Sequence, residues 1–166
     1  MQRAVRGQSE QKQSAAEVRP LTSRRDSSLH FKLGNSKGVD PTDLRNLFRA
    51  AGWTEDIARY SAPQIRKLLR HSHTVLTAWD GKALVGLASA VSDGALSGMV
   101  QNLVVHPRYR RRGLGARLLS ELAREMRAQR IASVYVLGTR GSKARAFFGR
   151  AGFRQLDWNV YVRLNR

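Results

Sequence analysis

The chain of 166 residues, 42% of them hydrophobic, is long enough for one domain with a single core and a short tail. It has no cysteine, so we expect no disulfide. No apolar run approaches the roughly 20 residues that a membrane helix needs, so we expect no membrane helix. Among the four histidines only His71 and His73 have a spacing that suits a metal, and we expect no metal site. The net charge of +18 lies mainly in the C-terminal half, because residues 94–166 hold 15 basic and 3 acidic side chains, and it favours anionic partners such as nucleotides or nucleic acid.

The N-terminal segment, residues 1–28, is rich in Gln, Ser and Arg and shows no hydrophobic periodicity. We expect it to be a disordered tail or the remnant of an organellar presequence, which has this composition. The folded domain is then expected over residues 29–166. It begins with "LHFKL" (29–33), whose alternating pattern predicts a strand.

Two helices are predicted next. The first has Asp40 as its N-cap, Pro41 in its first position and Gly52 as its end, and it presents one apolar face. The second begins after Ser61 and runs through "APQIRKLLRH". Neither helix carries an evident catalytic side chain, so both are interpreted as packing elements.

The middle of the chain predicts three strands. Residues 73–91 form a β-hairpin around an Asp80-Gly81 turn, which is a strong hairpin signal. A second turn, Ser92-Asp93-Gly94, leads into a third strand over about 95–105.

The C-terminal part predicts a long amphipathic helix that starts near Gly113, a buried strand over 133–137 and a helix over 142–152. Two further strands are expected over 153–156 and 158–164. The order of these elements predicts an α/β (α+β) protein in which a mixed sheet has helices on both faces.

The junction between the third strand and the long helix has the character of a phosphate-binding site. The first turn of a helix leaves backbone N–H groups without partners and carries partial positive charge, and glycine allows a phosphate to approach closely. The string here is Arg110-Arg111-Arg112-Gly113-Leu114-Gly115. It matches neither a Walker loop nor a dinucleotide fingerprint, because Lys-Ser/Thr and a third glycine are both missing.

With this Arg-x-x-Gly-x-Gly loop after a strand, the chain resembles the GCN5-related N-acetyltransferase (GNAT) superfamily. "VQNLVVHPRYRRRGLGARLL" is similar to the family's acetyl-CoA motif, and "ARAFFGRAGF" (144–153) is similar to its second motif. The resemblance covers about residues 75–164. The stretch "ALVGLASAVSDGALSGMVQNLVVHP" also looks like the plastid and cyanobacterial branch of the family.

The resemblance implies a mostly antiparallel mixed sheet in which a central pair of strands splays apart and holds acetyl-CoA. The wedge would lie between residues 103–105 and 134–137. Main-chain groups of the first strand would hold the pantetheine arm, the loop amides would hold the pyrophosphate, and arginine or lysine side chains would contact phosphates. The residues implied in cofactor binding are Leu103, Val104, Val105, Arg110, Arg111, Arg112, Gly113, Leu114, Gly115, Ala116, Lys143 and Phe147.

The same resemblance implies direct attack of an amine on the thioester, assisted in many members by a carboxylate base and a tyrosine acid. This chain departs from that pattern. Asn102 stands at the usual base position and Phe148 at the usual acid position, and neither transfers a proton. Gly141 stands where the family commonly has Asn. The catalytic candidates that we retain are Asn102, His106, Asp93 and Tyr135.

Two functions stay open at this point. One is an N-acetyltransferase acting on a small arylalkylamine or a protein amino group, since orientation alone supplies effective molarities of about 10⁵–10⁸ M. The other is a weak or inactive relative in an RNA-containing assembly, such as an organellar ribosome, which the basic charge favours. We expect the protein in a mitochondrion or chloroplast, or else in the cytoplasm.

Overall fold

The computed structural model describes residues 29–34, 39–53, 60–138 and 141–156. Their strands form one five-stranded sheet with the order β1-β2-β3-β4-β5. Neighbouring strands from β1 to β4 are antiparallel, and β4 pairs with β5 in parallel, which confirms the predicted mixed sheet. The strands are β1 (Leu29–Gly34), β2 (Thr74–Asp80), β3 (Ala83–Ser92), β4 (Ser97–Val105) and β5 (Ser133–Val136).

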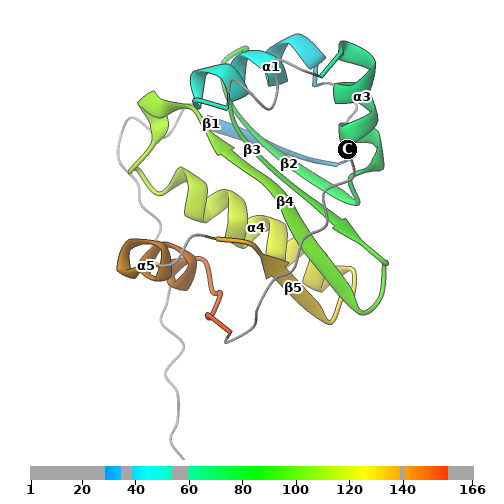
Figure 1. Cartoon of the computed structure of the whole chain (residues 1–166), viewed down its shortest axis with the longest axis vertical. Coiled ribbons are helices and arrows are strands. Elements are labelled where there is room, and N and C mark those ends of the chain that lie inside the picture. The colour runs from blue at the N-terminus through cyan, green and yellow to red at the C-terminus, as the bar shows by residue number, and fades with distance from the viewer. Residues whose placement is uncertain (1–28, 35–38, 54–59, 139–140, 157–166) are drawn as a thin grey trace, which may run out of the picture.

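Helices cover both faces of the sheet, as Figure 1 shows. On one face, α1 and α3 bury Leu44, Phe48 and Ile65 against β2, β3 and β4. On the other face, α4 buries its predicted leucine stripe, and α5 packs beside it. The helices are α1 (Pro41–Ala50), α3 (Ala62–His71), the short 3-10 helix η1 (Pro107–Tyr109), α4 (Leu114–Ala128) and α5 (Ser142–Arg150). No helix within the described ranges is long and apolar enough to cross a membrane.

The predicted caps and turns are present because each satisfies groups close to it in the chain. Asp40 Oδ1 accepts a hydrogen bond of 2.6 Å from the amide of Thr42 at the start of α1. Ser61 and Gln64 form a reciprocal capping box at the start of α3. Gly81, in the predicted β2–β3 turn, has a φ of +58°, a left-handed conformation that favours glycine.

Two sequence predictions need correction. Residues 153–156 were expected to form a strand, but they have no regular structure. The amide of Phe153 instead donates to the Phe148 carbonyl, a bond that completes the end of α5. β4 begins at Ser97 and not near residue 95, because the Asp93 carboxylate accepts from the amides that precede the strand. The expected strand over 158–164 and the N-terminal segment lie outside the described residues.

Candidate functional site

The candidate site begins where β4 leaves β5. The parallel pairing joins Ser97–Val100 to Ser133–Val136 and continues no further along the described part of β4. At the same point β4 has a β-bulge on its other side, because Ser89 pairs with Asn102 and Ala90 with Val100, which leaves Gln101 as an extra residue. A bulge bends the strand that carries it. The predicted splayed strand pair is therefore confirmed, and the C-terminal half of β4 has an open edge.

The main-chain groups of Val105 point to this open edge. The amide of His106 donates to the Val85 carbonyl of β3 at 2.9 Å. Because successive residues of a strand direct their N–H and C=O groups to opposite edges, Val105 and Leu103 face away from β3. In agreement, the Val105 carbonyl accepts from Arg110 Nε at 3.0 Å, outside the β3–β4 ladder.

The chain then turns into α4 through a loop with two left-handed residues. Arg111 has a φ of +59° and Gly113 a φ of +84°. The first helical hydrogen bond runs from the Arg117 amide to the Gly113 carbonyl at 2.9 Å. The amides of residues 111–116 donate to no acceptor among the described residues. This run of free donors at a helix start fits a phosphate group, as the sequence predicted.

Two phenylalanines of α5 lie against glycines of this site. A Cβ on Gly115 would be 3.4 Å from the Phe147 ring and 3.5 Å from Val105, so α4, α5 and β4 meet here in van der Waals contact. A Cβ on Gly138, just after β5, would be only 2.3 Å from the Phe148 ring. The two rings pack edge to face, with centroids 5.1 Å apart. Both motif regions of the sequence therefore converge on the gap between β4 and β5.

The comparison with known families agrees with this geometry. The model of the acetyltransferase (GNAT) family matches residues 42–153. The chain belongs to the GNAT family. It is similar to two proteins named uncharacterized N-acetyltransferase ycf52. With the protein from Porphyra purpurea it shares 24% identity over 106 residues, which is 61% of this chain and 59% of the relative. With the protein from Pyropia yezoensis it shares 24% over 113 residues, 64% of this chain and 63% of the relative. The matches thus span less than two thirds of these relatives.

Solved structures of acetyltransferases share the fold. A GNAT family acetyltransferase from Streptococcus pneumoniae has a TM-score of 0.63 and 28% identity, covering 83% of this chain and 98% of the bacterial one. A putative acetyltransferase from Deinococcus radiodurans has a TM-score of 0.63 and 23% identity, covering 86% and 93%. An aminoglycoside acetyltransferase from an uncultured soil metagenomic sample has a TM-score of 0.66 and 17% identity, covering 84% and 99%. The GNAT fold of this chain is therefore shown independently of its motifs.

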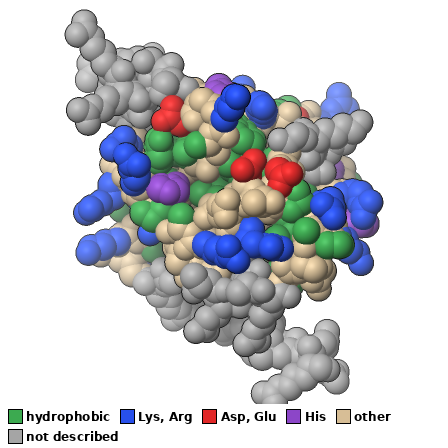
Figure 2. Space-filling view, turned by 90° about the horizontal axis from the view of Figure 1, so that it is seen from above, with side chains coloured by type: hydrophobic (Ala, Val, Ile, Leu, Met, Phe, Trp, Pro, Cys, Tyr) green, Lys and Arg blue, Asp and Glu red, His purple; other side chains and the backbone are tan. Residues whose placement is uncertain are grey.

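The arginines in the loop between β4 and α4 differ in their contacts with the rest of the protein. Arg110 is exposed, yet its guanidinium also donates to the Ala51 carbonyl at 2.9 Å, and it so joins β4 to the end of α1. Arg112 lies over the Tyr109 ring with 5.9 Å between the guanidinium carbon and the ring centroid. In the face shown in Figure 2, lysine and arginine side chains outnumber acidic ones around the periphery. The predicted phosphate contacts of Arg110, Arg112 and Lys143 stay predictions.

The four catalytic candidates do not gather in one place. Asp93 lies in the turn before β4 and His106 directly after β4, so the length of the strand, roughly 30 Å for nine residues, separates them. Tyr135 pairs with Met99 in the closed part of the β4–β5 pair. Asn102 lies beside the bulge, where the strands begin to separate. By position, Asn102 on the open half of β4 and His106 directly after this strand are the two candidates near the gap.

The hydrogen bonds of Asp93 and His106 are local. The amides of Ala95 and Ser97, and then that of Leu96, donate to the Asp93 carboxylate and hold its pKa below the usual value. A carboxylate with a lowered pKa is a weaker base. His106 Nδ1 accepts from the Arg108 amide at 3.3 Å, as in a cap of η1.

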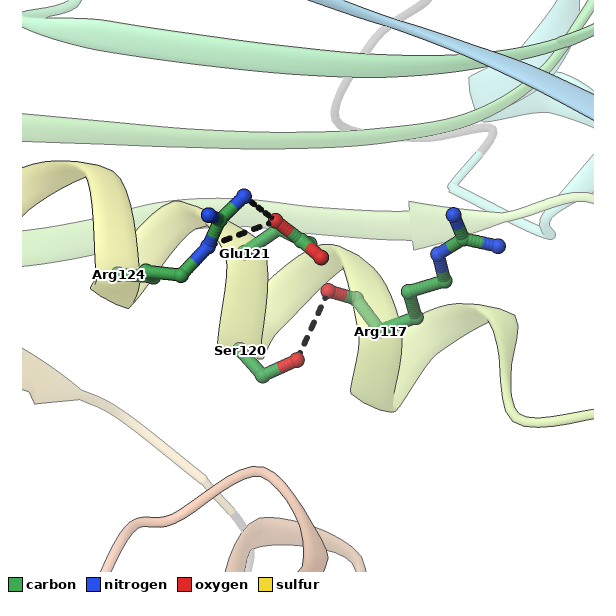
Figure 3. Close-up of polar contacts among 4 residues, drawn as sticks. All are labelled: Arg117, Ser120, Glu121 and Arg124. Atoms are coloured by element: carbon green, nitrogen blue, oxygen red, sulfur yellow. Dashed lines mark hydrogen bonds and ion pairs between the residues drawn. The ribbon is translucent and has the colours of Figure 1, made fainter. Parts of the chain in front are cut away.

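The acidic residues of α4 lie away from the wedge. Glu121 forms an ion pair with Arg124, and Ser120 Oγ donates to the Arg117 carbonyl at 3.1 Å (Figure 3). Glu121 and Glu125 line a shallow pocket with Phe31 of β1, the strand at the far edge of the sheet from β5. Neither carboxylate is therefore placed to act at the gap between β4 and β5.

Sequence reasoning missed two residues that support this site. Ser89 is a fully buried polar residue that accepts a hydrogen bond from Asn102. A hydroxyl within the apolar run "ALVGLASAV" was the available signal. Tyr109 donates to Asp80 across 29 residues of sequence, and no local pattern indicated that contact.

Proposed function

We propose that this chain is an N-acetyltransferase that moves an acetyl group from acetyl-CoA to an amine. The supporting observation is that the open edge of β4 is followed by six consecutive amides, those of residues 111–116, which donate to no acceptor in the described part of the chain. Coenzyme A has an extended amide arm joined to a pyrophosphate, so it matches an open strand edge followed by a helix N-terminus. The matched GNAT family and fold support the same reaction class.

Each part of the site has a role in this proposal. The main-chain groups of Leu103 and Val105 pair with the amide arm in the manner of an added strand. The amides of residues 111–116 bind the pyrophosphate, and Phe147 flanks the tail of the cofactor. Arg112 and Lys143 add positive charge at the rim. Arg110 contributes to the site mainly by fixing the end of β4.

When bound, acetyl-CoA supplies a thioester whose carbonyl carbon an amine attacks while the coenzyme A thiolate leaves. An N–H at the open edge of β4 donates to the carbonyl oxygen, on which negative charge grows. Asn102 takes no proton and Phe148 gives none, so the chain relies on orientation and on the neutral fraction of the amine. For an amine with a pKa near 10, that fraction is about one in a thousand at pH 7.

The acceptor that we propose is a small arylalkylamine or an amino group of a protein, and the location is an organelle. The alternative of a subunit in an RNA-containing assembly rests on the basic charge and on the missing base and acid at Asn102 and Phe148. Binding of the negatively charged phosphates of coenzyme A would account for the positive charge of the loop.

The test is thiol release from acetyl-CoA at pH 8 with 2-phenylethylamine, tryptamine and short peptides that carry a free α-amino or lysine group. Gly115→Glu introduces a carboxylate between Phe147 and Val105, where the proposed coenzyme A site begins, and is expected to abolish turnover. Gly149→Glu is the control for an added carboxylate, because Gly149 is an exposed residue of α5 and a Cβ there meets nothing within 4 Å. Equal turnover of wild type and Gly115→Glu would reject the proposal.

A further inference from the structure

The first strand, β1, forms the edge of the sheet opposite β5, and among the described strands it pairs only with β2. The Lys32 carbonyl is directed toward β2, because it accepts a hydrogen bond of 3.3 Å from Thr77 Oγ1. Since successive residues of a strand direct their N–H and C=O groups to opposite edges, those of Phe31 and Leu33 point away from the sheet. Within the described ranges no backbone hydrogen bond uses them, so this edge can accept a further strand.

The side chains of β1 leave this edge apolar on the α4 side and without a free charge. Leu29 and Phe31 pack against the α4 core, and Leu33, which alternation places on the same face, is 51% exposed. Lys32 lies on the opposite face, and its ammonium group is 4.9 Å from the centroid of the Trp79 ring in β2. The lysine that commonly prevents edge-to-edge pairing is therefore drawn back over the sheet.

The helix α4 runs beside β1 in the same direction. Near its start, Leu118 contacts Gly86 of β3, a residue that is level with Phe31 across the sheet. Near its end, Met126 contacts Gly98 of β4, which lies past the level where β1 ends. Positions along α4 thus correspond to positions along β1.

Opposite charges follow one another along this side of α4. The guanidinium carbon of Arg117 is 4.0 Å from the centroid of the Phe31 ring. Glu121, one helical turn later, lines a shallow pocket together with Leu33, two residues later in β1. Figure 3 shows Arg117 and Glu121 on the same side of α4. A positive group therefore accompanies Phe31, and a negative group accompanies Leu33.

This neighbourhood is close to neutral, although the chain has a net charge of +18. Residues 94–156 hold two acidic side chains, Glu121 and Glu125, and both line the pocket beside β1 with Arg117 and Arg124. Like charge over a whole surface keeps copies of a protein apart. Two copies of this chain thus repel each other less here than over its arginine-rich surfaces.

We infer that β1 is the contact surface for a second copy of this chain, which extends the sheet by antiparallel pairing about a two-fold axis at Lys32. Phe31 then forms backbone hydrogen bonds with Leu33 of the second copy, and the axis repeats this pairing. Arg117 comes beside Glu121 of the second copy. A register with Phe31 opposite Phe31 would instead bring the two Arg117 side chains together, so the charges favour the first register. The inference does not depend on the proposed function.

The first experiment measures the mass of the full chain by sedimentation and light scattering, from micromolar to submillimolar concentration, in salt that screens the net charge. Because the paired strands have only six residues each, we expect a weak dimer whose fraction rises with concentration. Leu33→Lys should weaken it at least about 10-fold, since a two-fold interface contains each substitution twice. Leu96→Lys is the matched control, because Leu96 is 73% exposed in the turn before β4 and should leave the dimer unchanged.

The second experiment tests the register with a single introduced cysteine, because the chain has none of its own. Lys32→Cys places two identical residues opposite each other at the axis, with Cα atoms about 4.5 Å apart, a separation that a disulfide spans. Mild oxidation should therefore link most of this variant into dimers. His30→Cys is the control, because His30 is equally exposed on the same face but would lie opposite Gly34. It should stay mostly monomeric after oxidation.

The third experiment reverses the charges. Arg117→Glu places carboxylates opposite each other and is expected to weaken the dimer about 3–10-fold. The double variant Arg117→Glu, Glu121→Arg restores opposite signs across the axis and should recover the dimer. A role of Arg117 within one copy alone would not produce this recovery.

Each readout can overturn the inference. A wild-type chain that stays monomeric over the whole range contradicts the contact surface, and so does a dimer that Leu33→Lys leaves intact. Equal disulfide formation by Lys32→Cys and His30→Cys contradicts the register, as does a charge-reversed double variant that remains monomeric. Thermal unfolding of each variant shows that it is folded, and should Leu33→Lys unfold, the two cysteine variants still decide the outcome. Loss of the dimer in Leu33→Lys, with selective linkage of Lys32→Cys, supports the inference.

Discussion

Tyr109 Oη donates a hydrogen bond of 2.6 Å to Asp80 Oδ2 and so joins the turn between β2 and β3 to the loop that leads into α4. The guanidinium of Arg112 lies over the same ring, and His106 packs edge to face against it. One side chain therefore holds the loop with the free amides against the rigid end of a hairpin. Pre-organisation of this kind lowers the entropy that a loop loses when it binds a ligand.

Tyr109→Phe is expected to destabilise the fold by about 1 kcal/mol at pH 8, because the hydrogen bond from Tyr109 Oη to Asp80 is lost. The hydrogen bond to Asp80, and then burial, raise the pKa of Tyr109 above its ordinary value of 10.0. A raised folded-state pKa stabilises the fold fully below pH 10 and loses this effect as pH rises through the folded-state pKa. Urea unfolding of both proteins at pH 8 and pH 11 checks this, and a difference that grows with pH would contradict it.

Substitutions of Arg110 distinguish the role of its hydrogen-bonding geometry from the role of its charge. Its guanidinium spans the carbonyls of Val105 and Ala51, which a lysine ammonium cannot do with the same fork. Arg110→Lys and Arg110→Ala are therefore expected to lose similar stability, about 1 kcal/mol for an exposed bridge. Thermal unfolding measures this. If Arg110 also contacts a phosphate, Arg110→Lys retains more coenzyme A affinity than Arg110→Ala. Full stability in Arg110→Lys would argue against the bridge.

Asp93 is expected to stabilise the turn before β4 and to take no part in catalysis. Its pKa is lowered by the amides of Ala95 and Ser97, so its contribution is present above its ordinary pKa of 3.8 and is lost as pH falls through the lower folded-state value. Asp93→Ala should lower the unfolding temperature at pH 7 and have a smaller effect near pH 3. The pH dependence of kcat should not change. Loss of the acidic limb of that profile, where activity falls as a base becomes protonated, would restore Asp93 as a base.

Gly138 and Gly149 form a matched pair for the packing of α5. A Cβ at Gly138 meets the rigid Phe148 ring at 2.3 Å, whereas a Cβ at Gly149 meets nothing within 4 Å. Gly138→Ala is expected to destabilise the fold by about 1–3 kcal/mol through overpacking. Gly149→Ala should stabilise it by about 0.5–1 kcal/mol through helix propensity. Denaturant titration measures both changes, and the same sign for the two would refute this account of the α5 contact.

Much of the fold was predictable because its signals are local. The caps and the hairpin turn involve only groups within four residues of each other, as at Asp40, Ser61 and Asp80-Gly81. The local sequence is therefore enough to predict them. The leucine stripe of α4 follows from helical periodicity alone. A local pattern gave a wrong prediction where another hydrogen bond used the same backbone group. The residues after α5 alternate like a strand, but the Phe153 amide is already used at the end of the helix.

The sequence by itself determined the elements, the glycine-bearing loop after β4 and, through its two motifs, the GNAT resemblance, since each depends on neighbours in the chain. Only the tertiary structure decided that Ser89 holds Asn102, that Tyr109 reaches Asp80, and that β4 leaves β5 after Val100. These relationships depend on strand register. A single bulged residue, Gln101, changes which side chains share a face, and no local preference specifies such a shift.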